Sequence, residues 1–118
     1  MVQEVPIVGL PLAVSAYLTM PSDQMAMLVD DIFTEDAIVP LSVHDQGHSY
    51  AGLAAIRSWQ RDVVAPLTFT RTITAITTRP GAVVVRAQLD GDFPGSPVDL
   101  HHHFSLVGDR ITVLTICP

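Results

Sequence analysis

The sequence predicts one α+β domain over residues 1–118, with helices gathered on one face of a sheet. Apolar residues make up 48% of the chain and charged residues 15%, which is enough apolar material for a real core. Apolar residues recur at helical spacing in the first half of the chain. In the second half they alternate with polar residues between turn signals, as in strands.

Three helices are expected in the first half. The first covers residues 11–20, with Pro11 in the first turn, where a missing N–H breaks no hydrogen bond. The second begins at Ser22, and its apolar stripe follows the i, i+3, i+4, i+7 spacing with Met25, Leu28, Val29 and Ile32. We also interpret Met27 as a core residue. The third begins at Gly52 and ends before Pro66, with a stripe made of Ile56, Trp59 and Val63.

Strands account for most of the remainder. A short strand over residues 36–39 stops at Pro40, and a loop or hairpin follows through residues 45–47. The second half then contains strands at about residues 67–78, 82–90, 98–107 and 110–117. In the strand over 82–90 one face carries Val83, Val85, Ala87 and Leu89. In the next strand one face carries Val98, Leu100, Phe104 and Leu106, with His102 in its middle.

Charge and cysteine content exclude several classes of function. The net charge of −6 argues against binding to nucleic acid or to an anionic membrane surface. No apolar run reaches the length of about 18 residues that a membrane span needs. The single cysteine, Cys117, predicts neither an internal disulfide nor a zinc cluster, and it fits a cytoplasmic location.

Three blocks occur in order along the chain: VDDIFTEDAIV over residues 29–39, GLAAIRSW over 52–59 and FSLVGDRIT over 104–112. With Tyr17, they resemble the motifs L-F-x-D-D-A-x-V, G-x-x-A-I-R-x-F and F-x-x-x-x-G-K-I of the nuclear transport factor 2-like superfamily. This superfamily includes the SnoaL-like polyketide cyclases and the ketosteroid isomerases. The resemblance implies a cone-shaped, curved antiparallel sheet that encloses a pocket with three helices. It also implies a homodimer formed through the outer sheet face.

Candidate site residues follow from the same resemblance. Tyr17 precedes Ala37 by twenty positions, as the oxyanion tyrosine of ketosteroid isomerases precedes the matching alanine. His102 falls where those enzymes carry a protonated aspartic acid. The pair could donate two hydrogen bonds to one substrate oxygen, each contributing about 3 kcal/mol in the best sites. Alternatively, a buried tyrosine and histidine only satisfy neighbouring polar groups. We expect the ligand to contact Trp59, Val85, Leu100, Phe104 and Leu114.

The general base of the isomerases has no counterpart here. Their aspartate aligns with Leu41 or Val39, and neither side chain can take a proton. His44 and Asp45 are the nearest candidates, because a histidine with a pKa of about 6.5 suits proton transfer at neutral pH. The alternative is that both lie in a solvated loop.

A metal site is the lesser interpretation of the run of three histidines. His101 and His103 share a strand face with Asp99, and a His-x-His pair can supply two metal ligands. The resemblance places this face on the outside of the sheet, where a homodimer interface is the better account. We therefore expect neither a metal nor another cofactor.

Two functions remain open. The first is a cofactor-independent isomerase, cyclase or dehydratase that acts by proton transfer on a small apolar carbonyl compound, such as a polyketide or terpenoid. The second is a non-catalytic module that binds a hydrophobic ligand or serves for dimerisation. An inward-facing base near Tyr17 and His102 would favour the first function.

Overall fold

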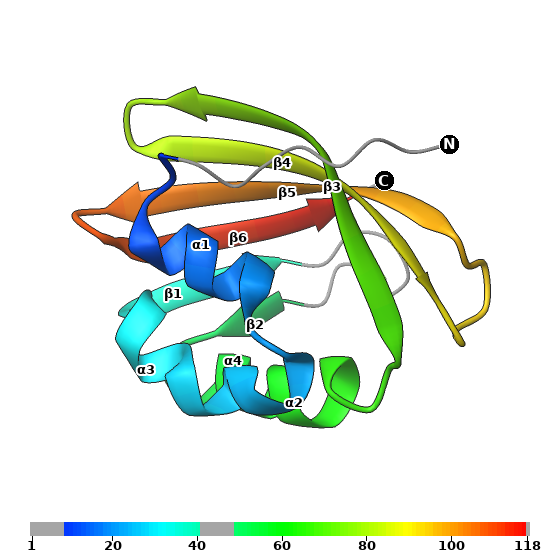
Figure 1. The fold of residues 1–118 in the computed structure, drawn as a ribbon. Coiled ribbons are helices and arrows are strands. Elements are labelled where there is room, and N and C mark those ends of the chain that lie inside the picture. Colours follow the sequence, from blue (N-terminus) through cyan, green and yellow to red (C-terminus); the bar gives the residue numbers. More distant parts are fainter. Residues whose placement is uncertain (1–8, 41–48, 118) are drawn as a thin grey trace.

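One six-stranded sheet forms the framework of the protein (Figure 1). The structure is a computed structural model and describes residues 9–40 and 49–117. The strands are β1 (Phe33–Pro40), β2 (Ser49–Ala51), β3 (Phe69–Arg79), β4 (Ala82–Gly91), β5 (Val98–Val107) and β6 (Arg110–Cys117). Their order across the sheet is β2-β1-β6-β5-β4-β3.

The sheet is curved and mainly antiparallel, as the resemblance implied, and one parallel pair makes it mixed. Strands β3 to β6 pair antiparallel with their neighbours, and β1 pairs antiparallel with the short strand β2. However, β1 runs parallel to β6. The two strands are far apart in the sequence, so no tight hairpin forces them to run in opposite directions. The pattern of β2 was too short to predict a strand.

Three helical segments cover one side of this sheet in the described part of the chain (Figure 1). The first is α1 (Leu12–Thr19). The second consists of α2 (Ser22–Met25), a 3₁₀ turn η1 (Ala26–Leu28) and α3 (Val29–Ile32). The third consists of α4 (Leu53–Trp59) and a π-helical turn η2 (Gln60–Val64). The predicted α+β class, with three helices against a curved sheet, is confirmed.

Two side chains depart from the predicted helical stripes. Met25, Val29 and Ile32 are buried as predicted, but Met27 is 82% exposed, so its interpretation as a core residue was wrong. Val63 was predicted to face the core; it lines the cavity described below but is 45% exposed, whereas Gln60 is buried. A π turn holds more residues than an α turn, so the side chains after Trp59 depart from strict α-helical spacing.

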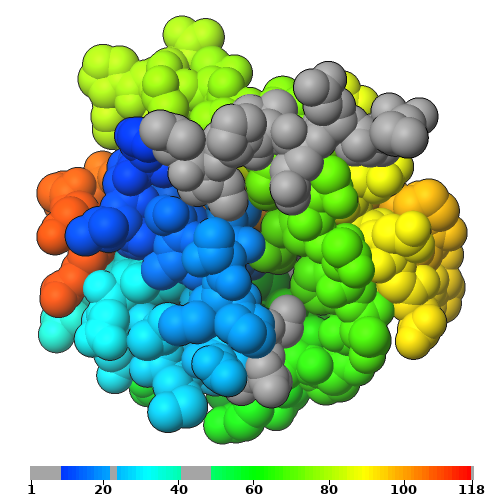
Figure 2. All heavy atoms as spheres, viewed as in Figure 1, coloured from blue at the N-terminus to red at the C-terminus, as the bar shows by residue number. Residues whose placement is uncertain are grey.

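The core lies between the helices and the inner face of the sheet. Val83, Val85 and Ala87 of β4 are buried, and so are His102 and Phe104 of β5, as the alternation predicted. Figure 2 shows the side on which the N-terminal helices lie next to the segment of β3. In the described residues, no helix is long and apolar enough to span a membrane.

Candidate functional site

A cavity of about 430 Å³ lies between the helices and the inner face of the sheet. Its walls come from α1, from the segment α4–η2, from strands β3 to β6 and from the loop between β4 and β5. The volume lies in the range of typical small-molecule sites. Most of the side chains that line the cavity are aliphatic or aromatic.

Tyr17 projects from α1 into this cavity. Its side chain is only 3% exposed, and its ring packs edge-on against the rings of Phe104 and Phe33, at centroid distances of 5.6 Å and 6.4 Å. Burial raises the pKa of the Tyr17 phenol, while the charge of Arg71 and a hydrogen bond with it act in the opposite direction. The hydroxyl group therefore stays protonated at neutral pH and can donate a hydrogen bond.

His102 lies in the middle of β5 and faces the cavity. It is 1% exposed, and its Nδ1 atom has no hydrogen-bond partner among the described residues. Burial, together with the charge of Arg71, lowers the pKa of His102 to about 3, although a hydrogen bond with the Val85 backbone acts in the opposite direction. The imidazole is therefore neutral at pH 7, with a ring nitrogen available to a ligand.

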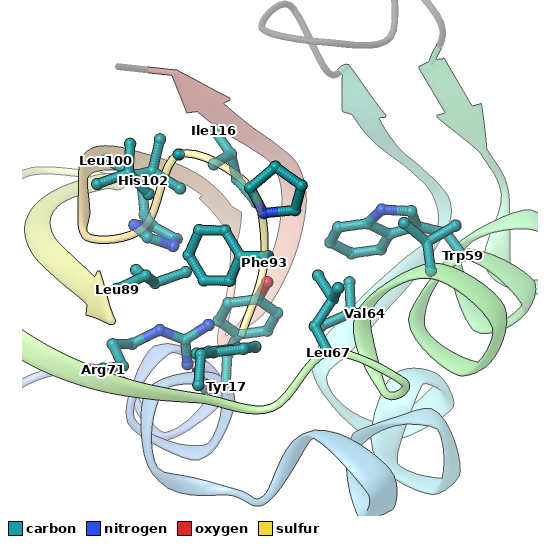
Figure 3. A pocket seen from close by; sticks show the side chains of 15 residues that line it. Tyr17, Trp59, Val64, Leu67, Arg71, Leu89, Phe93, Leu100, His102 and Ile116 are labelled. Atoms are coloured by element: carbon teal, nitrogen blue, oxygen red, sulfur yellow. Dashed lines mark hydrogen bonds between the residues drawn. The ribbon is translucent and has the colours of Figure 1, made fainter. Parts of the chain in front are cut away.

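Tyr17 and His102 lie at one end of the cavity, on opposite elements (Figure 3). Their ring centroids are 6.4 Å apart. The side chains that the resemblance paired are thus neighbours in the structure. Whether they hold one substrate oxygen together stays a prediction.

Arg71 is a third polar group at this end, and it was not among the predicted site residues. Its guanidinium carbon lies 5.4 Å from the centre of the Tyr17 ring and 5.4 Å from that of Phe69, at distances typical of cation–π contacts. Its Nη1 donates to the carbonyl oxygen of Tyr17 over 3.5 Å. Its Nε is buried without a partner among the described residues. Alternation of Phe69, Arg71 and Ile73 on one face of the predicted strand was the available signal.

The other predicted ligand contacts divide into two groups. Trp59 and Leu100 line the cavity. Val85, Phe104 and Leu114 are fully buried but are not among the lining residues, so they support the wall from behind. His44 and Asp45 lie outside the described residues.

The opposite end of the cavity is apolar. Figure 3 shows Arg71 and His102 on one side, and Trp59, Val64 and Leu67 on the other. Phe93, from the loop between β4 and β5, lies between the two groups. No ligand contact was predicted from this loop, because its side chains carry no periodic pattern. The cavity therefore has a polar end and an apolar end.

His101 and His103 project from the outer face of β5, with ring centroids 6.4 Å apart. On the same face Arg86 Nη2 lies 3.4 Å from Asp99 Oδ2, so this aspartate already has a cationic partner. Within residues 9–40 and 49–117, no three His, Cys, Asp or Glu side chains gather in the way a metal ion would need. A dimer interface remains our interpretation of this face.

Comparison with solved structures places the chain among known folds. A predicted polyketide cyclase from Sinorhizobium meliloti is 30% identical, with a TM-score of 0.78 over 92% of this chain and 95% of that one. A predicted SnoaL-like polyketide cyclase from a Jannaschia species is 15% identical, with a TM-score of 0.72 over 89% of this chain and 81% of that one.

A third similar structure is a protein from Catenulispora acidiphila with a ketosteroid isomerase-like fold, in complex with trimethylamine. It is 20% identical, with a TM-score of 0.67 over 92% of this chain and 85% of that one. No family model matches the sequence, and neither does any curated protein. From the match at 30% identity over 92% of this chain and 95% of the other, the chain belongs to the family of the predicted polyketide cyclase, and it shares the nuclear transport factor 2-like, ketosteroid isomerase-like fold with the other similar structures.

Proposed function

We propose that this protein binds a small, largely apolar molecule through a carbonyl oxygen, which accepts hydrogen bonds from Tyr17 and His102. The observation that carries the proposal is the unsatisfied Nδ1 of His102 beside the buried Tyr17, in a cavity whose opposite end is apolar. A buried polar group without a partner costs about 1–3 kcal/mol, so a ligand that satisfies it gains affinity.

The two side chains differ from ordinary core residues in where they point. A tyrosine or histidine that only fills space places its polar atom against a neighbouring group, because an unpaired atom is unfavourable. Here both residues line the open volume, and both are uncharged at neutral pH. The phenol of Tyr17 is neutral there in any case, and burial keeps the His102 imidazole from taking up a proton. Neutral donors at the wall of an apolar cavity orient a carbonyl group without the cost of burying a charge.

The test is a titration with acetylcyclohexane, a small ketone with an apolar ring. We expect saturable binding to the wild type, and about fivefold to tenfold weaker binding to Tyr17→Phe and to His102→Leu, since each loses one hydrogen bond. His103→Leu is the matched control, because this neighbouring histidine is exposed on the outer face. Equal affinity in His102→Leu and His103→Leu would overturn the proposal.

Catalysis by proton transfer is the second candidate, as a cofactor-independent isomerase, cyclase or dehydratase. The observation in its favour is that Tyr17, His102 and Arg71 meet at one end of the cavity (Figure 3). Such a group of donors can stabilise the negative charge that develops on an enolate oxygen. The described lining residues include no carboxylate to act as base, and a histidine with a pKa of about 3 is a weak base. His44 and Asp45 remain the candidates for that role.

The two candidates differ in one measurable step. An enzyme of this kind must remove a proton next to the carbonyl group of its ligand. We therefore expect it to accelerate exchange of the α-hydrogens of acetylcyclohexane for deuterium in heavy water, which NMR follows directly. Asp45→Asn and His44→Gln should each slow the exchange if that residue is the base. Saturable binding without exchange would favour a non-catalytic binding module.

The outer sheet face supports a further part of the proposal, a homodimer. The face carries Val84, Val113 and Thr115 beside His101 and Ser105, and all five side chains are only partly exposed within one chain. A second copy packed here would cover the faces of β4, β5 and β6 and leave the cavity on the opposite side of the sheet unobstructed.

A further inference from the structure

Arg71 differs from the other arginines of the protein because it alone lines the cavity. Arg57, Arg61 and Arg86 each pair with a carboxylate, those of Asp30, Asp62 and Asp99. The described residues offer Arg71 no such partner, although its Nε is buried. It is the one charged side chain among the described residues that line the cavity.

An unpaired guanidinium in an apolar cavity is unfavourable. Removing a charge from water is unfavourable unless an opposite charge or a set of hydrogen bonds compensates it. The faces of Tyr17 and Phe69 and one carbonyl oxygen compensate part of this cost. A neutral ketone would leave the charge itself unpaired.

Two polar atoms at this end of the cavity lack partners within the described part of the chain: Nε of Arg71 and Nδ1 of His102. A carboxylate has two oxygens and can accept one hydrogen bond from each of these residues. A planar guanidinium matches a planar carboxylate closely, and hydrogen bonds between charged groups are about twice as strong as neutral ones.

We propose that the ligand of this cavity is a small monocarboxylate, with its carboxylate held by Arg71 and His102 and its apolar body packed against Trp59, Val64 and Leu67. The inference rests on the proposed function, because it assigns the ligand class of the same cavity. It requires the neutral His102 tautomer with the proton on Nδ1, and in that tautomer the other ring nitrogen cannot donate to the Val85 backbone carbonyl. The net charge of −6 opposes anion binding at long range, so the specificity must arise locally at Arg71.

The decisive experiment compares two probes that differ in charge and little else: cyclohexanecarboxylate and acetylcyclohexane. Isothermal titration calorimetry at pH 7 gives both dissociation constants. We expect the carboxylate to bind the wild type at least about tenfold more tightly than the ketone. Arg71→Gln should abolish this preference, because carboxylate binding loses its charged partner. Arg86→Gln, on the outer face, should keep the preference.

The outcomes separate the two proposals. If neither probe binds the wild type, the proposed function fails and this inference fails with it. If the ketone binds and the carboxylate binds no better, the proposed function stands and the carboxylate assignment is overturned. Retention of the preference by Arg71→Gln would also overturn the assignment, because the charge would then be recognised elsewhere.

A stability measurement tests whether Arg71 already has a carboxylate partner within the chain, for which Asp45, outside the described residues, is a candidate. Replacement by methionine keeps most of the side-chain volume and removes the charge. If no carboxylate of the chain is paired with Arg71, Arg71→Met should leave the urea midpoint unchanged or raise it. A clear fall of the midpoint in Arg71→Met, restored in Arg71→Lys, would mean that the chain supplies the carboxylate itself and would overturn the inference.

Discussion

At the scale of single residues, His102 shows how burial changes chemistry. Its folded pKa of about 3 lies below the unperturbed value, so the unfolded chain takes up a proton before the folded one does. The contribution of this residue to stability is complete above pH 6.5 and is lost as the pH falls toward 3. Between pH 7 and pH 5 we expect the free energy of unfolding to fall by about 2 kcal/mol from this group. Urea unfolding of the wild type and of His102→Leu at pH 7 and at pH 5 measures this fall.

His103→Leu is the control for this pH dependence. His103 is exposed, so its replacement should leave the fall between pH 7 and pH 5 unchanged, whereas His102→Leu should remove most of it. The leucine variant should also fold, because the inner face around position 102 is apolar. NMR titration of an imidazole signal of His102 near pH 6.5 would show that the residue is exposed and would contradict the site described above.

At the scale of elements, the pairing of β3 with β4 depends on a glycine at the rim of the cavity. Gly91 pairs with Phe69, a lining residue, and a Cβ atom at position 91 would lie 2.0 Å from the Thr68 carbonyl oxygen and 2.7 Å from Phe69 Cα. The strands must therefore separate to accept a side chain. We expect Gly91→Ala to destabilise the protein by about 1–3 kcal/mol and to weaken binding of acetylcyclohexane.

Gly108→Ala is the matched control in thermal unfolding. Gly108 has a φ of 62°, but an added Cβ atom would meet nothing within 4 Å. Gly108→Ala should therefore lower the free energy of unfolding by only about 1 kcal/mol, because an alanine must adopt the left-handed backbone conformation there. It should leave ligand binding unchanged. If Gly91→Ala were no less stable than Gly108→Ala and bound the ketone equally well, the close contact between β3 and β4 would not govern the rim.

At the scale of the whole molecule, the outer sheet face governs assembly. Light scattering at micromolar concentration should give about twice the chain mass of 12.7 kDa if two copies pack through this face. Val84→Arg places a charge in the middle of the face and should shift the mass to that of one chain, since an unpaired charge is unfavourable in an interface. Leu12→Arg is the control, because Leu12 is already 83% exposed on the helical side. A wild-type mass of 12.7 kDa would refute the dimer.

The sequence alone determined most of the elements and most of their faces. Helical spacing and strand alternation predicted which side of each element is buried, including the inward position of His102 in β5. These patterns are reliable because an element with one apolar face has one orientation that buries it. The resemblance added the pairing of His102 with Tyr17, which lie 85 positions apart and cannot be paired from local pattern.

Only the tertiary structure decided the composition of the cavity. Arg71 reaches Tyr17 because β3 lies beside α1, and Phe93 reaches the cavity because the β4–β5 loop folds over it. Conversely, Val85, Phe104 and Leu114 share the inner face with the lining residues yet lie behind them. Alternation tells which face of a strand is buried, but sheet curvature and the neighbouring elements decide whether a buried side chain meets the cavity or the core. Sheet curvature and the arrangement of neighbouring elements depend on contacts between residues far apart in the sequence, which local spacing does not encode.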